Sequence, residues 1–201
     1  EELVLSIDPA LGRDVQWDKE MLERAVRSGM QEALADAEDR LRAWAARNGV
    51  SLAIVRAPGI YAQTRLPLER LRQQTPVLVP EDDVYTNHVH ADDLARVAIA
   101  ALFRGRPNRA YHATDDAELK MGQWFDAVAD AYRMPRPPRV GWEEAEARIA
   151  PMLLSFMSES RRLSNDRMKR ELRARLRYPT PQAMLDEAPP RELRKQMPLS
   201  F

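Results

Sequence analysis

The residue types best suited to chemistry gather in one short stretch that contains His88, His90, Asp92 and Asp93. On an extended segment both imidazoles point to the same side, so they could meet a substrate or a metal ion. A zinc site needs three or four ligands, which an aspartate would have to complete, and we therefore expect no metal. The interpretation that we favour is that His90 and the aspartates cap the first turn of a helix, whose free N–H groups need acceptors.

A second candidate site is the turn at Pro58 and Gly59, which is followed by Ile60 and Tyr61. It comes after the apolar run 50–55, which is typical of a strand buried on both faces in a parallel sheet. At the carboxyl end of such a strand, proline fixes the turn and glycine lets the backbone approach a flat ring. The alternative is an ordinary turn that ends a strand.

The elements that must position these residues are predicted from the spacing of apolar residues. Asn48 and Gly49 should stop a helix in the left-handed conformation, and the buried strand that follows is half of a βαβ unit. In the helix after Asp93, the inward stripe should comprise Leu94, Val97, Ala98, Ala101 and Leu102. We expect helices over 17–27, 31–47, 66–72, 90–103, 121–132, 142–149, 152–158 and 163–176, and strands over 3–7, 50–55, 77–79 and 110–113.

Composition limits the class of protein. The chain has 201 residues, no cysteine, and 31 basic against 31 acidic residues. Disulfides and thiolate metal sites are excluded, and no overall charge favours nucleic acid or an anionic membrane. No apolar run approaches the roughly 20 residues of a spanning helix. We expect a cytoplasmic protein with a small-molecule substrate, and the start at Glu1 suggests a fragment or a processed chain.

Two motifs resemble a known family. Residues 55–61, Val-Arg-Ala-Pro-Gly-Ile-Tyr, resemble the Arg-x-Pro-Gly-x-Tyr-type loop that follows the sixth strand of extended short-chain dehydrogenases. Residues 85–95 resemble that family's (F/Y)-V-H-V-D-D-(V/L)-A segment, which leads back from the substrate lobe into a core helix. Weaker similarities over 111–122 and 151–165 extend the resemblance to the NAD-dependent epimerase/dehydratase proteins over about 37–185.

The resemblance implies an α/β fold, with a partial Rossmann-like parallel sheet over 1–110 and a smaller, mostly helical substrate lobe over 111–201. It also implies NAD or NADP as cofactor and an oxidoreductase or epimerase activity on a hydroxyl or carbonyl group. Pro58, Gly59 and Ile60 would lie at the nicotinamide end of the cofactor. The residues implied on the substrate side are Tyr61, Asn87 and His88.

Two features of the family are missing from the sequence. A Gly-x-x-Gly-x-x-Gly-type loop should hold the pyrophosphate, but the early glycines are only Gly12 and Gly29. The positions of the expected Tyr-x-x-x-Lys pair align with Met30 and Leu34, and no tyrosine precedes Tyr61. The catalytic residues are therefore unknown. The alternative to an enzyme of impaired activity is a non-catalytic nucleotide-binding or scaffold protein.

The basic stretch 161–177 could suggest a nucleic-acid binder. Leu163, Met168, Leu172 and Leu176 recur in it at helical spacing, so we interpret its basic residues as the solvated face of an amphipathic helix. Arg161 could border the substrate cleft. Thr86 stands where nucleotide-sugar enzymes of the family often carry a diphosphate-binding arginine, which disfavours a sugar nucleotide. A homodimer formed through helices is a further option.

Overall fold

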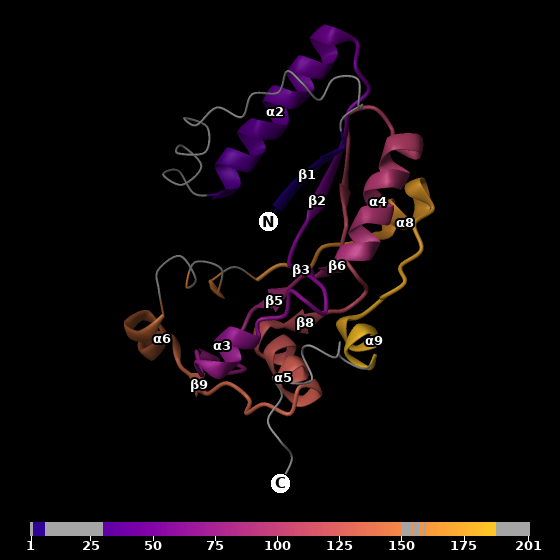
Figure 1. The fold of residues 1–201 in the computed structure, drawn as a ribbon. Coiled ribbons are helices and arrows are strands. Elements are labelled where there is room, and N and C mark those ends of the chain that lie inside the picture. Colours follow the sequence, from indigo (N-terminus) through magenta and orange to yellow (C-terminus); the bar gives the residue numbers. More distant parts are fainter. Residues whose placement is uncertain (1, 7–29, 150–153, 155–156, 159, 188–201) are drawn as a thin grey trace. The chain divides into compact units, whose positions relative to one another are not determined.

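The structure is a computed structural model that describes residues 2–6, 30–149, 154, 157–158 and 160–187 (Figure 1). Its elements alternate along the chain, as expected for an α/β protein. In order they are β1 Glu2–Ser6, α2 Met30–Asn48, β2 Ala53–Ala57, β3 Ile60–Tyr61, α3 Leu68–Arg72, β4 Val77–Leu78, β5 Tyr85–Thr86, β6 Val89–His90, α4 Ala91–Arg104, β7 Arg109–His112, β8 Leu119–Lys120, α5 Met121–Ala131, β9 Arg139–Val140, α6 Trp142–Arg148, α8 Asp166–Leu172 and α9 Pro181–Leu185.

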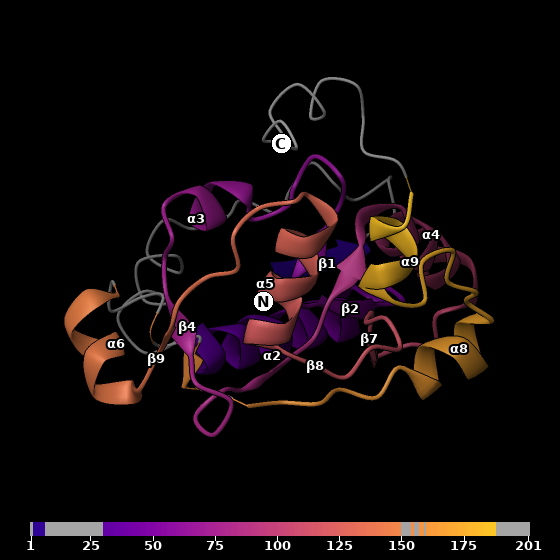
Figure 2. The same ribbon diagram turned by 90° about the horizontal axis from the view of Figure 1, so that it is seen from below.

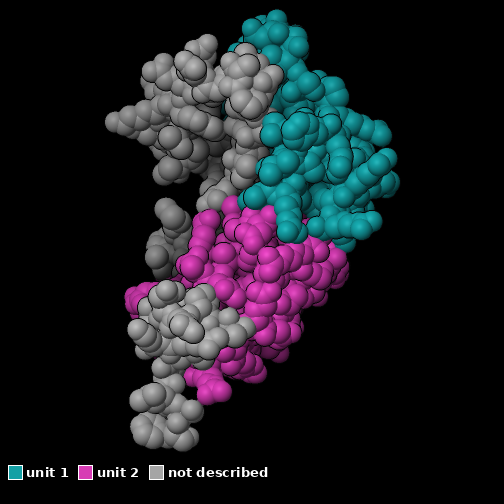
Figure 3. Space-filling view, turned by 45° about the vertical axis from the view of Figure 1, so that its right-hand side comes forward, with its two compact units in different colours: residues 1–57, 94–113, 165–175 teal, residues 58–93, 114–164, 176–201 magenta. Residues whose placement is uncertain are grey.

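The chain forms two compact units (Figure 3). The first comprises 1–57, 94–113 and 165–175, and the second comprises 58–93, 114–164 and 176–201. The sequence-based division instead has one boundary at residue 110. The units interleave because β7 pairs with β2 and α8 packs against β7, although both elements come after residues of the second unit.

The sheet of the first unit has the strand order β1-β2-β7, with β2 in the middle. β2 is parallel to β7 and antiparallel to β1, so the sheet is mixed. Ile54 and Val55 are fully buried, which confirms a strand covered on both faces. The strand begins at Ala53, later than predicted, because the Val50 N–H donates to the Ala45 carbonyl (2.9 Å) and still belongs to the helix end.

The end of α2 and most of the buried stripe of α4 agree with the prediction. α2 ends as expected, with Gly49 in the left-handed region at φ +66°. In α4, Leu94, Val97 and Ala101 are buried, but Leu102 is 46% exposed. The prediction for Leu102 was wrong because it lies about 100° around the helix from Ala101, at the edge of the stripe.

In the part of the second unit that the structure describes, three two-stranded sheets surround a core around α5. β3 pairs with β6 and β4 with β9, both in parallel, whereas β5 pairs with β8 in antiparallel. α5 packs against α3 and α9 (Figures 1 and 2). Its inward residues are those predicted, namely Trp124, Phe125, Val128 and Ala129.

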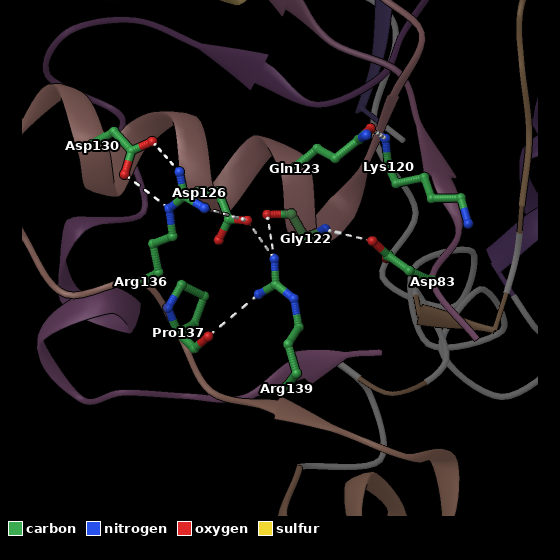
Figure 4. Close-up of polar contacts among 9 residues, drawn as sticks. All are labelled: Asp83, Lys120, Gly122, Gln123, Asp126, Asp130, Arg136, Pro137 and Arg139. Carbon is green, nitrogen blue, oxygen red and sulfur yellow. Dashed lines mark hydrogen bonds and ion pairs between the residues drawn. The ribbon is translucent and has the colours of Figure 1, made fainter. Parts of the chain in front are cut away.

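A polar network fixes the start of α5 (Figure 4). The Gly122 N–H donates to Asp83 Oδ2 (3.0 Å), which satisfies a free donor of the first turn. Arg139 donates to the Gly122 carbonyl (3.2 Å) and to Asp126 Oδ2 (2.6 Å). The network therefore ties β9 and the loop before β5 to one end of the helix.

The last part of the chain differs from the prediction. α8 covers Asp166–Leu172 rather than 163–176, because Arg173 adopts a left-handed conformation (φ 55°) that ends it. Met168 and Leu172 are fully buried, as the stripe predicted. α9 was not expected.

The helix predicted over 17–27 and most of that over 152–158 lie outside the described residues. None of the described helices is long and apolar enough to cross a membrane.

Candidate functional site

The Pro58-Gly59 turn packs directly against the segment that carries Asn87 and His88. The Val89 N–H donates to the Gly59 carbonyl (3.3 Å), and β3 runs parallel to β6. Gly59 has φ +31°, and a Cβ on it would lie 2.9 Å from His88 Cδ2 and 2.5 Å from the Asn87 carbonyl oxygen. A side chain cannot fit there, so glycine is required by the protein itself. The two segments singled out by sequence thus lie side by side in the second unit.

Asn87 and Arg161 are brought together through the backbone. The Asn87 amide donates to the Arg161 carbonyl (3.0 Å) and accepts from the Leu163 N–H (2.8 Å). The Arg161 N–H donates to the Tyr85 carbonyl (3.3 Å). The Asn87 side chain therefore holds segment 161–163 beside β5 and has a positioning function.

His88 lies in an aromatic cluster with Tyr61 and Trp124. Its ring centroid is 4.9 Å from that of Trp124 and 6.3 Å from that of Tyr61, whose ring it meets edge-on. His88 is 7% exposed, and burial lowers its pKa to about 4. The imidazole is therefore neutral at pH 7 and can offer one donor and one acceptor.

Asp115 was not predicted as a site residue. Its N–H donates to the His88 carbonyl (2.7 Å), and the Thr114 hydroxyl donates to the same oxygen (3.1 Å). Burial raises the pKa of Asp115 to about 7, although hydrogen bonds from the Ala117 N–H (3.0 Å) and from Tyr61 oppose this. Asp115 can therefore exchange a proton near neutral pH. The signal in the sequence was a polar run just beyond the carboxyl end of a strand.

Tyr61 stands between this acid and the imidazoles. It is 2% exposed, and burial, followed by the charge of Asp115, raises its pKa. Its hydroxyl is buried without a hydrogen bond of standard geometry among the described residues, so its interaction with Asp115 is a loose one. Tyr61 therefore stays protonated at any ordinary pH and does not act as a base.

His90 and Asp93 have structural functions. The Asp92 N–H donates to His90 Nδ1 (3.2 Å), which confirms the predicted cap of α4 by His90. Asp93 also binds backbone groups far along the chain, which was not predicted. Its carboxylate accepts from the N–H groups of Arg177 and Tyr178 (2.8 Å each) and so holds the segment before α9. Among the described residues, no three potential metal ligands lie together.

Arg56 of the Arg-x-Pro-Gly motif has a partner on α2, in the first unit. Arg56 Nε and Nη2 donate to the two carboxylate oxygens of Glu38 at 2.7 and 2.8 Å. Burial alone would raise the pKa of Glu38, but the hydrogen bonds and charge of Arg56 outweigh it and lower the pKa. The ion pair thus joins α2 to β2.

The positions of the expected catalytic pair fall on the same helix. Met30 and Leu34 occupy them, and both lie within α2.

Comparisons with known proteins reveal the fold. No family profile and no curated protein matches the chain. A functionally unknown conserved protein from Silicibacter pomeroyi is 29% identical, with a TM-score of 0.62 over 76% of this chain and 51% of that one. A nucleoside-diphosphate-sugar epimerase from Pseudomonas aeruginosa is 19% identical, with a TM-score of 0.61 and the same coverage. A human epimerase family protein solved with NADPH is 12% identical, with a TM-score of 0.56 over 74% of this chain and 50% of that one.

The chain spans about half the length of these solved proteins. Two of these three proteins carry epimerase names, and the parallel pairing of β2 with β7 agrees with a Rossmann-like sheet. The chain thus has the Rossmann-like α/β fold of the NAD-dependent epimerase/dehydratase proteins, the family that its motifs resemble.

Proposed function

We propose that this chain supplies the nicotinamide end and the substrate side of an NAD(P)-dependent oxidoreductase or epimerase that acts on a small hydroxyl- or carbonyl-bearing compound. The observation that carries the proposal is the close packing of the Pro58-Gly59 turn, at the carboxyl end of β2, against Asn87 and His88. Ligands of open α/β sheets bind at this end of the strands. We also propose that the protein acts in the cytoplasm. This compartment is reducing, so a chain without cysteine forgoes no disulfide bond there.

The residues present fit the nicotinamide end of the cofactor and not its pyrophosphate. Gly59 is exposed, whereas its Cβ direction is filled by Asn87 and His88. Pro58 is buried and fixes the turn, whereas Gly59 and Ile60 are accessible. The bare Gly59 backbone therefore offers a surface against which a flat ring can lie. When bound, the nicotinamide supplies hydride exchange. The sequence contains no glycine-rich phosphate loop, so we expect weak affinity from this chain.

On the substrate side we assign the direct contact to His88. Its neutral imidazole can exchange hydrogen bonds with a hydroxyl or a carbonyl group. Tyr61 is buried against the His88 ring, and the Asn87 amide is engaged by backbone groups. Tyr61 thus positions His88, and Asn87 positions the segment that carries Arg161. Arg161 follows on the segment that Asn87 binds, and we propose that it borders the same cleft.

A non-catalytic nucleotide-binding or scaffold protein is the second candidate. It is favoured by Met30 and Leu34, which stand where a proton donor and its activating lysine would be. Neither side chain can transfer a proton. Tyr61 does not replace them, because its pKa is raised. This candidate predicts cofactor binding without turnover, or no binding at all.

Titration with NADH and with NADPH tests the proposal. Energy transfer from tryptophan to the bound nicotinamide is the signal, and Trp124 packs on His88. We expect saturable binding to the wild type that is about ten-fold weaker in Gly59→Ala. Gly49→Ala is the matched control, because Gly49 also has positive φ but has no atom within 4 Å of its Cβ position. Lack of saturation by about 1 mM in the wild type would refute the proposal.

A second measurement separates the two candidates. The chain is incubated with a 4-deuterated reduced cofactor and a panel of small aldehydes and ketones, and deuterium in the alcohol products is measured. Transfer that is lost in His88→Gln supports the enzyme. Saturable binding with no transfer to any compound supports the non-catalytic protein.

A further inference from the structure

The peptide unit that joins His88 to Val89 is held on both of its edges. Its N–H, which belongs to Val89, donates to the Gly59 carbonyl (3.3 Å). Its carbonyl, which belongs to His88, accepts from the Asp115 N–H (2.7 Å) and from the Thr114 hydroxyl (3.1 Å). All these residues belong to the second unit. Because a peptide unit is planar, the three bonds together set the direction in which the His88 side chain leaves the backbone.

Of these three bonds, Thr114 makes the one that comes from a side chain. The short bond from the Asp115 N–H fixes a distance, but a single bond leaves the carbonyl group able to turn about it. A second donor to the same oxygen removes that freedom. The Thr114 hydroxyl has one proton to donate, and the Asp115 carbonyl is its more distant acceptor, at 3.5 Å. The bond to the His88 carbonyl is therefore the stronger use of this hydroxyl.

Burial makes the Thr114 hydroxyl hard to replace. Thr114 is 1% exposed and His88 is 7% exposed, so solvent water does not reach the carbonyl in its place. A buried carbonyl that loses a donor is left with an unmet hydrogen bond, which costs free energy. We expect the peptide unit to turn in response. The His88 ring would then move from its contact with Trp124, where the ring centroids are 4.9 Å apart.

We propose that Thr114 is a positioning residue that orients the His88 imidazole for the substrate by holding the His88 carbonyl group. Thr114 itself is too buried to touch a substrate, so its effect passes through His88. The functional meaning of this inference rests on the proposed function, in which His88 makes the direct contact. The orientation of His88 can be measured without cofactor or substrate, so the two can fail separately.

NMR titration of the histidine side chains tests the inference, and the chain has three histidines to resolve. The pKa of His88 is about 4 in the wild type because the ring is buried. Thr114→Val keeps the shape of the side chain and removes its hydroxyl, so the ring should gain contact with water and the pKa should rise by about one unit. Thr114→Ser keeps the hydroxyl and should retain the wild-type value. His88→Gln identifies the resonance.

Thr180→Val is the matched control. The Thr180 hydroxyl accepts from the Ala183 N–H (3.3 Å) at the start of α9, so its loss weakens a helix cap elsewhere in the same unit. A His88 pKa that stays unchanged in Thr114→Val, or that rises equally in Thr180→Val, would overturn the inference. If Thr114→Val does not fold, Thr114→Ala removes the same hydroxyl without placing a methyl group against the carbonyl.

Deuterium transfer from the reduced cofactor gives the functional readout. We expect Thr114→Val to lower the transfer by about ten-fold or more, because a small misplacement of a contact group costs much of its effect, and Thr114→Ser to recover it. Transfer that is unchanged although the His88 pKa has risen would show that the substrate does not depend on this orientation. A wild type that transfers no deuterium would refute the enzyme, whereas the titration would still decide whether Thr114 positions His88.

Discussion

Replacing Asp115 with asparagine is expected to stabilise the folded chain above pH 7 and to leave its stability near pH 4 unchanged. Asp115 is 4% exposed, and burial raises its pKa from 3.8 to about 7. Above pH 7 the folded chain must hold a buried carboxylate that the unfolded chain keeps in water. The change in pKa corresponds to about 4 kcal/mol, which is the upper limit of the stabilisation.

The sign follows from the number of bound protons. Between pH 3.8 and about 7 the folded chain holds a proton on Asp115 that the unfolded chain lacks. The contribution of Asp115 to stability therefore falls as the pH rises through this window and is constant above it. Asparagine keeps the shape and neutrality of the protonated carboxyl group. The difference in unfolding free energy between variant and wild type should thus grow from near zero at pH 4 to its plateau above pH 7.

Urea unfolding at a series of pH values, followed by tryptophan fluorescence, measures this difference. Trp124 lies in the cluster around His88 and reports on the site. Asp116→Asn removes the same charge from the exposed neighbouring residue and serves as the control. A difference that is constant with pH, or an asparagine variant that is less stable at pH 8, would show that Asp115 is ionised and well paired in the folded chain.

Three further replacements test the packing and the ion pair by the same unfolding assay. Gly105→Ala should destabilise by about 1–3 kcal/mol, because its Cβ would overlap the Ala101 carbonyl oxygen; Gly141→Ala, with nothing within 4 Å, should not. Glu38→Gln should cost about 1–2 kcal/mol, since its partners Arg42 and Arg56 are 31% and 40% exposed and stay hydrated. Wild-type His88 must charge on unfolding below pH 6.5, a loss of up to about 3 kcal/mol by pH 4 that the opposite change at Asp115 offsets; in His88→Gln the stability should therefore rise as the pH falls from 6.5 to 4.

Long apolar stripes made the helices predictable, whereas the sequence did not predict where every helix ends. α2 and α5 match their predicted ranges within two residues, because many residues contribute to each stripe. The two-residue strands β3, β5 and β6 are too short to show any period, and they exist through pairing with distant segments. β4 was predicted, as part of the apolar run 77–79. α8 ends at Arg173 in a left-handed conformation, for which arginine gives no signal.

The sequence predicted only part of the site, because it shows local motifs and not the contacts between distant residues. Pro58, Gly59 and His88 were identified because their motifs are local in the sequence and resemble a known family. Asp115 was missed because the sequence does not show that its carboxyl group is buried. Nor does it show that the Asp115 N–H donates to the His88 carbonyl, 27 positions earlier. Asp93 was assigned to its own helix, since a local cap is the simplest use of an aspartate at that position. Its bonds to the N–H groups of Arg177 and Tyr178, far along the chain, could not be predicted from local sequence.

The opposite pKa changes of His88 and Asp115 cancel over one range of pH. At pH 5 the unfolded chain carries a charged imidazole and an ionised carboxylate, whereas the folded chain carries both groups neutral. Each state holds one proton on the pair, so these residues give the wild type no slope of stability between about pH 4 and 6.5. Asp115→Asn should reveal a stability that rises with pH, His88→Gln one that falls, and the double variant neither. A site that folds with both groups uncharged suits a neutral hydroxyl or carbonyl compound better than an anion.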